Sequence, residues 1–317
     1  MNETQPIKII SGVTTCKGKS ILPVMAYKWG FIGISIFFML ASLFLLATKG
    51  LNYGVDFVGG TKNIYRFAEG TKIDDVRSAL EGLDFGDIQV IAFEQDRQIP
   101  QYLIRVKSIS GVDVSQILTD RLVKKFPGKT ELVSQETVGP KVGADLQKKA
   151  IASVSLTCLL ILIYTGFRFD FLFAPGAIIA LFHDVLISVG FFAFFGKEFT
   201  LPILAALLTI LGFSVNDTIV VYDRIRENIK HLPKHISASR IVDISLTETF
   251  SRTIITNLTV LLVVVALFLV GGGVLHDFAF CMIVGVIFGT YSSIFIASPI
   301  YLWLQKIFPN QGIKKDV

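Results

Sequence analysis

Two pairs of polar side chains interrupt segments of this sequence that are otherwise apolar. Asn216 and Asp217 lie within the apolar run 201–222, and His183 and Asp184 lie near the middle of the preceding run. A charged residue at the centre of a membrane-spanning helix costs about 2.5–3.5 kcal/mol to insert, so such residues usually face a bundle interior or a wet cavity and serve a function. A carboxyl group in that setting can bind and release a proton.

Arg252, at the start of the next apolar run, is the cation that a returning helix would bring beside Asp217. Burial favours the neutral form of a carboxyl group, whereas a nearby guanidinium favours the charged form. Small movements of the helices would therefore change which form Asp217 takes. Arginine does not release its own proton in proteins, so Arg252 would gate or compensate the charge without carrying the proton.

Structural roles are open for the same residues. Asn216 and Asp217 would also suit hydrogen bonds between helices, although their types favour proton or ion handling. The residue types favour neither role for His183 and Asp184. Adjacent positions lie about 100° apart around a helix, so these two side chains are expected to point in different directions. An arginine at a helix end also commonly extends its side chain to the membrane surface.

Other chemistries find no support in the residue patterns. The sequence has no GxSxG, HExxH or Walker A pattern, so no enzyme is predicted. Its three cysteines, Cys16, Cys158 and Cys281, form no CxxC pair or Cys/His cluster, so neither a metal nor a cofactor is predicted. The net charge is +5, but no basic patch is interleaved with aromatic residues, so no nucleic-acid partner is predicted.

The elements that must position these residues are membrane-spanning helices. The chain has 317 residues, of which 52% are hydrophobic and 17% charged, against about 25% charged residues in a typical soluble domain. Six apolar runs are near the length of about 20 residues that crosses a bilayer. These runs cover 30–48, 150–167, 171–195, 201–222, 253–270 and 278–304. The sequence thus predicts a polytopic α-helical membrane protein with a segment 1–29, a first span 30–48, an insertion 49–149, five further spans within 150–304 and a tail 305–317.

The distribution of basic residues orients these spans. Lysine and arginine are enriched in loops that stay in the cytoplasm. With six spans, one side receives Lys8, Lys17, Lys19, Lys28, Arg168, Arg224, Arg226, Lys230, Lys234, Arg240, Arg252, Lys306, Lys314 and Lys315. The short loops of the other side carry only Lys197. Both termini are therefore predicted to be cytoplasmic, and the insertion 49–149 is predicted to lie on the periplasmic, extracytoplasmic side.

The insertion has the pattern of a small α+β domain. Strands are predicted at 61–68, 87–94, 101–109 and 129–138, with helices at 74–83 and 112–126. The residues from Thr71 to Asp74 resemble a capping box that opens the first of these helices, and Pro127-Gly128 ends the second. The resulting order βαββαβ is the split, ferredoxin-like arrangement.

Two rows of small or polar residues predict surfaces for close packing. Thr209, Gly212 and Asn216 share one face of their helix. The last span carries a small residue at every fourth position, which suits contact with another span of this chain or of a second protein. Those residues are Gly285, Gly289, Ser293 and Ala297.

Several long motifs, in order, resemble the SecD/SecF protein-export family. The segment GVDFVGGT (54–61) is similar to the family's DFxGG signature. Downstream follow VGPKVGADL (138–146), the FRFD turn (167–170), HDV in span three, FSVNDTIVVYDRIREN (213–228) and TFSRTIITNLTVLL (249–262). The Asn-Asp-Thr of span four and the short insertion favour the SecF branch of the family over the SecD branch. The match covers nearly the whole chain after the first 28 residues.

This resemblance implies a function and partners. The chain would be one six-span half of a twelve-span unit of the RND transporter superfamily, with SecD as the other half. The pair would use the proton-motive force of the bacterial inner membrane to assist preproteins that leave through the SecYEG channel, with YajC and YidC as associates. The family's functional acid and arginine map onto Asp217 and Arg252. Asp56, Gly59 and Gly60 of the signature are expected to form the joint between membrane and domain, where glycine permits positive φ.

The expected mechanism starts at Asp217, with Arg252, Asn216, Asp184 and His183 as further candidates for proton coupling. Protonation would loosen the attraction of the acid to the guanidinium, the helices would shift, and the shift would reach the outer domain through span one and the joint. Sodium is possible in place of the proton. The rival functions are a proton-driven exporter of small molecules or lipids from the same superfamily and a scaffold subunit without a proton path.

Overall fold

Within the residues that the structure describes, six helices are long and apolar enough to cross a membrane, which confirms the predicted number of spans. The structure, a computed structural model, describes residues 8–10, 13–16, 19–83, 85, 88–92, 99–106, 113–128, 130–169, 172–233 and 235–308. The spans are α1 (Lys28–Thr48), α5 (Pro140–Arg168), α6 (Ala174–Phe195), α7 (Leu201–His231), α8 (Ala238–Val270) and a last span, Gly273–Ile307, made of α9 (Gly273–Ser292), η2 (Ser293–Ala297) and α10 (Ser298–Ile307).

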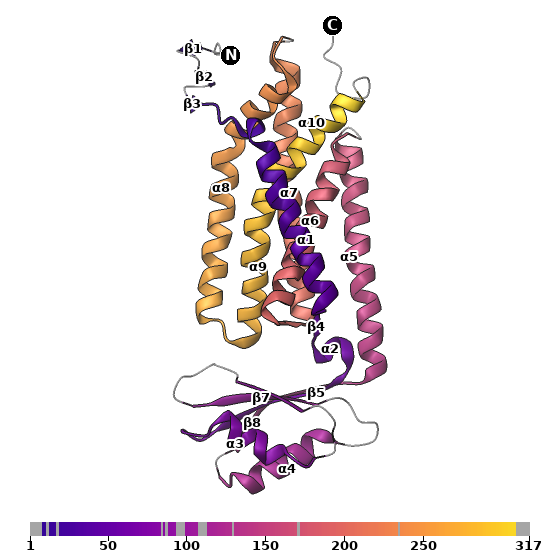
Figure 1. Ribbon diagram of the computed structural model, residues 1–317, viewed down its shortest axis with the longest axis vertical. Helices are drawn as coiled ribbons and strands as arrows, with labels where there is room; N and C mark the ends of the chain where they lie inside the picture. Colours follow the sequence, from indigo (N-terminus) through magenta and orange to yellow (C-terminus); the bar gives the residue numbers. More distant parts are fainter. Residues whose placement is uncertain are drawn as a thin grey trace.

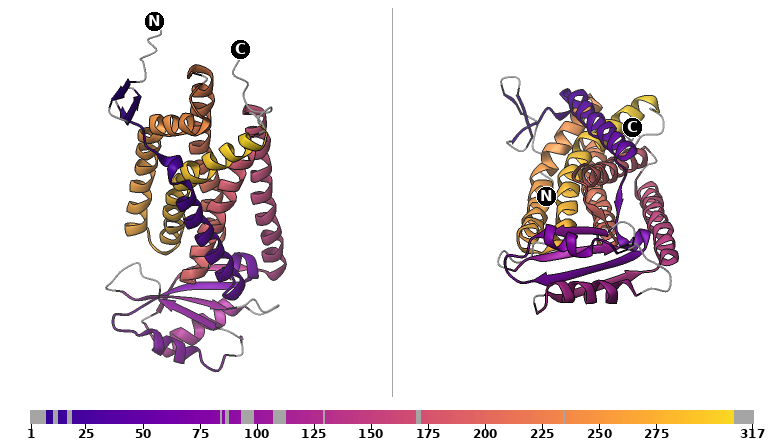
Figure 2. Two further views of the ribbon diagram at one scale, coloured as in Figure 1. Left: turned by 45° about the horizontal axis from the view of Figure 1, so that its top comes forward. Right: turned by 60° about the horizontal axis from the view of Figure 1, so that its bottom comes forward.

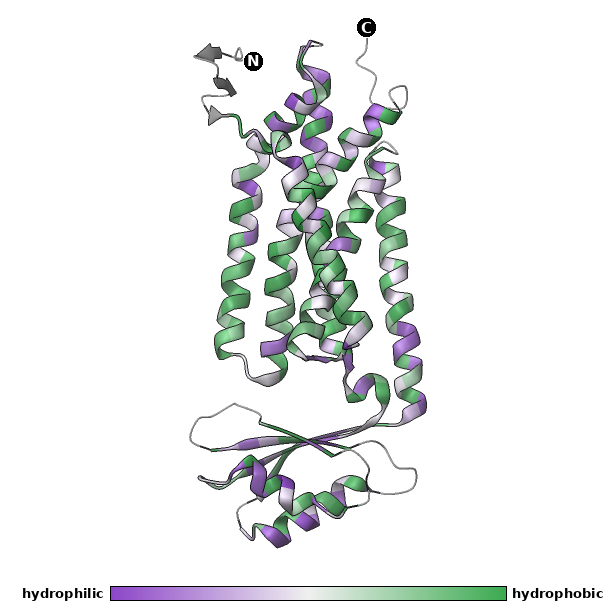
Figure 3. Ribbon diagram, in the orientation of Figure 1, coloured by the Kyte–Doolittle hydropathy of each residue, from purple (hydrophilic) through white to green (hydrophobic). Residues whose placement is uncertain are grey.

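The spans form one bundle, and a separate small domain lies at one of its ends (Figure 1). The start of α1 and the end of α10 lie at the opposite end. The most apolar 18-residue stretch of α6 is 56% buried and that of the last span 61%, whereas α5 has only 6% buried and α1 11%. The outer helices therefore present apolar side chains to their surroundings, as the hydropathy colouring shows (Figure 3), whereas α6, α9 and half of α7 form the interior.

The small domain follows the predicted order of elements. Its sheet contains β5 (Gly60–Phe67), β6 (Ile88–Ala92), β7 (Gln101–Val106) and β8 (Thr130–Val138), antiparallel in the spatial order β6-β7-β5-β8. The helices α3 (Ile73–Leu80) and α4 (Val114–Lys125) cover the face that points away from the bundle (Figures 1 and 2). The predicted strand ends at 93–94 and 107–109 lie outside the described residues, as do residues 1–7, 11–12 and 17–18 of segment 1–29 and positions 309–317 of the tail.

The core of this domain forms where alternate strand residues meet the two helices. Tyr65, Phe67 and Ile104 of the sheet pack against Leu118 and Leu122 of α4, and all five are almost fully buried. Burying each large apolar side chain contributes about 1.5–3 kcal/mol. Asp113 is the N-cap residue of helix α4, and its side chain accepts a hydrogen bond from the backbone of Gln116, as N-cap residues do.

The predicted capping box of α3 is wrong by one position. The helix begins at Ile73, and Asp75 accepts a hydrogen bond from the backbone of Lys72 over 3.2 Å. The hydroxyl of Thr71 is engaged elsewhere, because it donates to the carbonyl of Ala68 and closes the turn at Gly70. A hydroxyl used in this way does not cap the helix that follows, so the N-cap position moves from Thr71 to Lys72.

Short elements beside the spans were not predicted. At the end that carries the domain, β4 (Asn52–Tyr53) pairs in parallel with β9 (Glu198–Phe199), and the helical turn α2 (Val55–Val58) follows β4. At the opposite end, three short strands, β1 (Lys8–Ile10), β2 (Val13–Cys16) and β3 (Lys19–Ser20), and the 3-10 turn η1 (Val24–Ala26) precede α1. The backbone of Met25 in η1 donates to Asp243 of α8, which ties this segment to the bundle.

Candidate proton-coupling site

Helix α7 positions the acid that the sequence singles out. It runs for 31 residues from Leu201, with Pro202 in its first turn, where a proline's missing N–H costs nothing. Asp217 lies near the middle of the helix, and its residue is 5% exposed. A carboxyl group at this depth has left bulk water but remains close to the edge of the bundle.

Asn257 of the neighbouring helix α8 is the hydrogen-bond partner of Asp217. Its amide donates to Oδ2 of the acid, and the asparagine is itself buried. Arg252, one turn and a half earlier on α8, is exposed and interacts electrostatically with Asp217 without forming an ion pair within 4.0 Å of it. The sequence thus indicates the correct neighbouring helix, but an amide makes the direct contact.

The row of Thr209, Gly212 and Asn216 lies on the exposed side of α7. The hydroxyl of Thr209 bonds to the carbonyl of Ala205 within the helix, and Gly212 has no atom within 4 Å of the position that a Cβ would take. This face of α7 therefore combines small and polar side chains with open space in front of them, beside the acid. Asn216 itself does not lie in the buried site with Asp217.

His183 and Asp184 form a second polar cluster in the centre of the bundle. Both residues are completely buried, and Nδ1 of the histidine lies 2.9 Å from Oδ1 of the aspartate. Their polar groups thus meet inside the bundle, although the two positions lie about 100° apart around the helix. The hydroxyls of Ser214 and Ser292 donate to Oδ2 of Asp184 over 2.5 and 2.8 Å. The cluster joins α6, α7 and α9 through one carboxyl group.

Helix α7 contributes to both acid sites, but each site involves a different neighbouring helix. Ser214 and Asp217 are three residues apart on α7, yet Ser214 meets Asp184 while Asp217 meets Asn257. Within the part of the chain that the structure describes, no hydrogen bond or ion pair joins the two acids directly. Nε2 of His183 has no hydrogen-bond partner among those residues and lies in a ring environment that includes Tyr291.

The row of small residues in the last span packs inside this chain. A Cβ on Gly285 would come within 2.2 Å of Ile210 on α7, and one on Gly289 would come within 3.3 Å of Ser214. Ser293 and Ala297, in the π-helical turn η2, are fully buried. The hydroxyl of Tyr222 on α7 donates to the carbonyl of Ala297. The row therefore lets α9 pack closely against α7. Ser292 of α9 then lies within hydrogen-bond distance of Asp184 on α6.

The predicted joint residues attach the domain to the bundle. Gly59 and Gly60 have positive φ angles of 79° and 152°, and a Cβ on Gly59 would lie 2.7 Å from Cα of Pro140 at the start of α5. Asp56 has a specific partner, because its Oδ2 accepts a hydrogen bond from the backbone of Leu201 over 2.8 Å. The aspartate of the signature therefore caps the first turn of α7, the helix that carries Asp217.

Three residues that the sequence does not assign to the site supply the remaining hydrogen bonds of the two acids. Asn257, Ser214 and Ser292 supply the hydrogen bonds to the two acids. Near the end of the bundle opposite the domain, Arg224 of α7 lies 2.6 Å from Glu248 of α8. The only sequence signal for these partners is a polar residue inside or beside an apolar run, which is too common for serine and asparagine to single them out.

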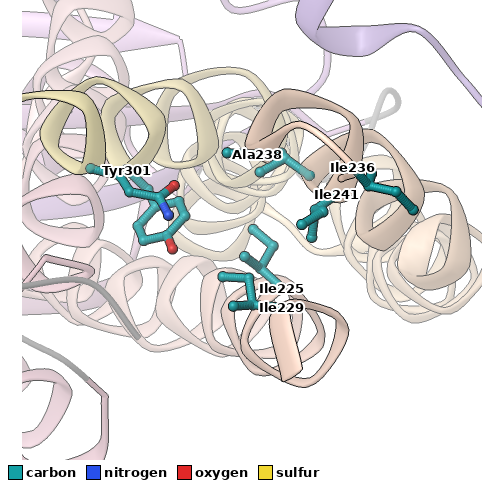
Figure 4. Close-up of a pocket in the computed structure, with 8 residues that line it drawn as sticks. Ile225, Ile229, Ile236, Ala238, Ile241 and Tyr301 are labelled. Carbon is teal, nitrogen blue, oxygen red and sulfur yellow. The ribbon is translucent and has the colours of Figure 1, made fainter. Parts of the chain in front are cut away.

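Among the described residues, no group of three or more His, Cys, Asp and Glu side chains lies close enough together to hold a metal ion. A cavity of about 180 Å³ lies where α7, α8 and α10 meet, at the end of the bundle opposite the domain (Figure 4). Its wall is mainly isoleucine, with Tyr301 and Gln305 on one side. It contains none of the predicted site residues.

Two family models match the chain. The model described as protein export membrane protein SecD/SecF, C-terminal, matches residues 118–307, and the model described as SecD/SecF GG motif matches residues 44–62. The second of these ends just beyond the joint glycines at 59 and 60. The first contains both acids, their partners and all spans after the first.

Related proteins cover nearly the whole chain. The protein translocase subunit SecF of Magnetococcus marinus is 45% identical over 277 residues, which are 86% of this chain and 88% of that protein. The subunit SecF of Desulfurispirillum indicum is 37% identical over 301 residues, 93% of this chain and 95% of that protein. The crystal structure of SecDF, a translocon-associated membrane protein from Thermus thermophilus, has a TM-score of 0.80 at 33% identity and covers 92% of this chain. The present chain spans 40% of that longer one.

Six spans, with a small domain after the first and a polar site on the fourth, define a polytopic membrane protein of the transport type. The chain belongs to the SecD/SecF family of protein-export membrane proteins. Its relatives over nearly their full length are SecF subunits of protein translocases.

Proposed function

We propose that this chain is a SecF-type translocase subunit that uses the proton-motive force to assist preprotein export through the SecYEG channel. The observation that carries the proposal is the setting of Asp217. It is buried on the fourth span, bound by one amide, and close enough to the exposed Arg252 for an electrostatic attraction. An acid with so few fixed partners changes its contacts on α8 when it gains or loses a proton.

A SecD-like subunit is the proposed partner of the exposed face of α7. Thr209, Gly212 and Asn216 offer a small, polar surface with open space at Gly212, and small residues let helices approach closely in membranes. The SecDF chain of Thermus thermophilus, 39% identical to this one over 281 residues, contains this region as 38% of its length. A second bundle against this face would enclose a proton route to Asp217. YajC and YidC are further proposed associates.

The proposed location is the bacterial inner membrane, with both termini in the cytoplasm and the domain in the periplasm. The basic residues support this orientation, because Arg224, Arg226 and Lys230 lie on the last turns of α7, at the end opposite the domain. Positive charge is enriched on the cytoplasmic side of membrane proteins. We interpret the domain 60–138 as a ferredoxin-like unit on the basis of its order βαββαβ. It would hold and release the emerging polypeptide.

The test replaces Asp217 with asparagine, which keeps the size of the side chain but removes its titration. Export driven by a proton gradient would be measured in membrane vesicles that contain the SecD-like partner. Asp217→Asn should abolish the gradient-dependent part of export. The control is Asp223→Asn on the same helix, because Asp223 is exposed and only loosely paired with Arg168, 3.6 Å away. That variant should export normally.

Export that remains fully dependent on the gradient in Asp217→Asn would refute the proton role. Normal export without any dependence on a gradient, in the native chain, would favour the scaffold function. Purification of the native complex from membranes distinguishes the remaining rival, since a small-molecule or lipid exporter would not bring a SecD-like subunit and the SecYEG channel with it. Replacing the proton gradient by a sodium gradient in the same vesicles identifies the coupling ion.

A further inference from the structure

One charged contact links the sheet of the domain directly to the entrance of α7. Arg105 of β7 and Glu198 of β9 approach within 2.5 Å, and their side chains are only 13% and 16% exposed. Glu198 lies three residues before the first residue of α7, and Arg105 lies in an interior strand of the sheet. The pair therefore connects two segments that the chain separates by about ninety positions, at a place where water has little access.

The charges around Arg105 show why the sheet requires this carboxylate. Lys62 lies opposite Arg105 on the neighbouring strand β5, and like charges directly opposite one another destabilise a sheet. Lys62 is neutralised within the domain by Glu136 of β8, 3.6 Å away. Gln89, opposite Arg105 on β6, accepts a hydrogen bond from it but carries no charge. Arg105 thus takes its negative partner from the bundle.

Four further contacts hold the same short segment of the bundle. The backbone of β4 pairs with β9, and the backbone N–H of Gly54 donates to the carbonyl of Phe199 over 2.8 Å. Asp56 caps Leu201, and a Cβ on Gly54 would come within 2.7 Å of Thr200. Residues 198–201 are therefore held on one side by the linker from α1 and on another by the sheet. Closely packed groups are hard to compress, so a displacement of residues 198–201 is passed on to the linker and to the sheet.

We propose that Arg105 and Glu198 form a permanent latch that makes the domain move as one body with the outer end of α7. The inference rests on the proposed function, and it changes the expected route of coupling. From the sequence alone, a shift is expected to reach the domain through span one. With the latch, a displacement of α7 around Asp217 travels along the same helix, over roughly 24 Å at 1.5 Å per residue, and arrives at Glu198. Arg105 and Glu198 act as positioning residues and do not handle the proton.

The test measures the position of the domain relative to the bundle in the complete complex. Spin labels would be placed on exposed sites at Lys124 of α4 and Val274 of α9, after Cys16 and Cys158 are replaced by serine. The native latch should give one narrow distance distribution. Glu198→Gln should broaden it and should remove most of the gradient-dependent export, at unchanged abundance in the membrane. The double variant Arg105→Glu, Glu198→Arg should restore both.

A matched control and the contrary results complete the test. Glu131→Gln breaks the exposed pair between Arg66 and Glu131 inside the same sheet and should change neither readout. The latch is refuted if Glu198→Gln leaves the distance distribution as narrow as this control, or if it leaves export intact while Asp217→Asn abolishes it. Export that survives Asp217→Asn counts against the proposed function instead, and the distance distribution then decides on the latch alone.

Discussion

Asp184 and Asp217 are the same residue type on adjacent helices, and their surroundings differ in almost every respect. Asp184 is completely buried and has three side-chain partners, which come from α6, α7 and α9. Asp217 is 5% exposed, has one amide partner on α8 and lies near an exposed arginine. The first acid is enclosed by donors that belong to the bundle, and the second borders a surface that a partner can cover.

The number of hydrogen-bond partners distinguishes an acid suited to holding helices together from an acid suited to exchanging a proton. A hydrogen bond within a folded protein contributes about 0.5–1.5 kcal/mol, so the three partners of Asp184 tie three helices to one another. Asp217 lacks such a set, and its contact with α8 can change without opening the interior. We therefore propose a packing role for the cluster of Asp184 and His183, and we keep proton coupling as the proposed role of Asp217 with Arg252.

Chemical modification should give the largest difference between Asp184 and Asp217. A hydrophobic carbodiimide reacts with protonated carboxyl groups that it can reach from the membrane. We expect it to modify Asp217 and to leave Asp184 untouched, because Asp184 has no exposed surface. Mass spectrometry of the peptides from α6 and α7 reads out both sites. Modification of Asp184 before Asp217 would reverse the assignment.

Removal of the enclosed acid should cost the most stability. Asp184→Ala leaves His183, Ser214 and Ser292 without their shared partner, and each buried polar group that loses its hydrogen bond costs about 1–3 kcal/mol. We expect a marked fall in the thermal unfolding temperature of the purified protein in detergent. Asp217→Ala is the comparison and should lower that temperature much less. Equal effects of the two substitutions would contradict the structural role of Asp184.

The amide beside Asp217 should have an intermediate effect. Asn257→Leu removes the hydrogen bond to Asp217, which is worth about 1–3 kcal/mol, and should also reduce gradient-dependent export. Asn216→Leu is the matched control, because it alters an exposed amide next to the same acid. In the isolated chain the control should leave the unfolding temperature unchanged. If Asn216→Leu lowered the unfolding temperature more than Asn257→Leu, the assignment of Asn257 as the partner of Asp217 would be wrong.

The smallest effects concern the two serines that share Oδ2 of Asp184. Ser214→Ala and Ser292→Ala should each lower the free energy of unfolding by about 1 kcal/mol. Groups that share a partner do not act independently, so the double variant should differ from the sum of the single ones. An additive result in the same unfolding assay would mean that the two hydroxyls do not bind one carboxyl group.

The spans could be predicted from the sequence because a bilayer imposes a minimum length of apolar residues. Helix ends outside the apolar runs could not, since α5 starts at Pro140 and α7 continues to His231 through polar residues. Asp217 could be found because an acid contrasts with apolar neighbours. Its partner Asn257 could not, because the rotation of one helix against another depends on packing across the whole bundle. The pairing of β4 with β9 joins segments too short to show a pattern.

The π-helical turn Ser293–Ala297 has a consequence for how the last span is used. Such a turn accommodates one residue more than an α-helical turn, so the side chains beyond it are rotated by about 100° relative to an uninterrupted helix. Before the turn, Gly289 faces Ser214 and Asp184; beyond Ala297, Tyr301 stacks on Phe173 of the loop before α6. A single extra residue thus lets one strip of the sixth span serve two sets of neighbours, and deleting it would put the part of that helix beyond Ala297 out of phase with the rest of the bundle.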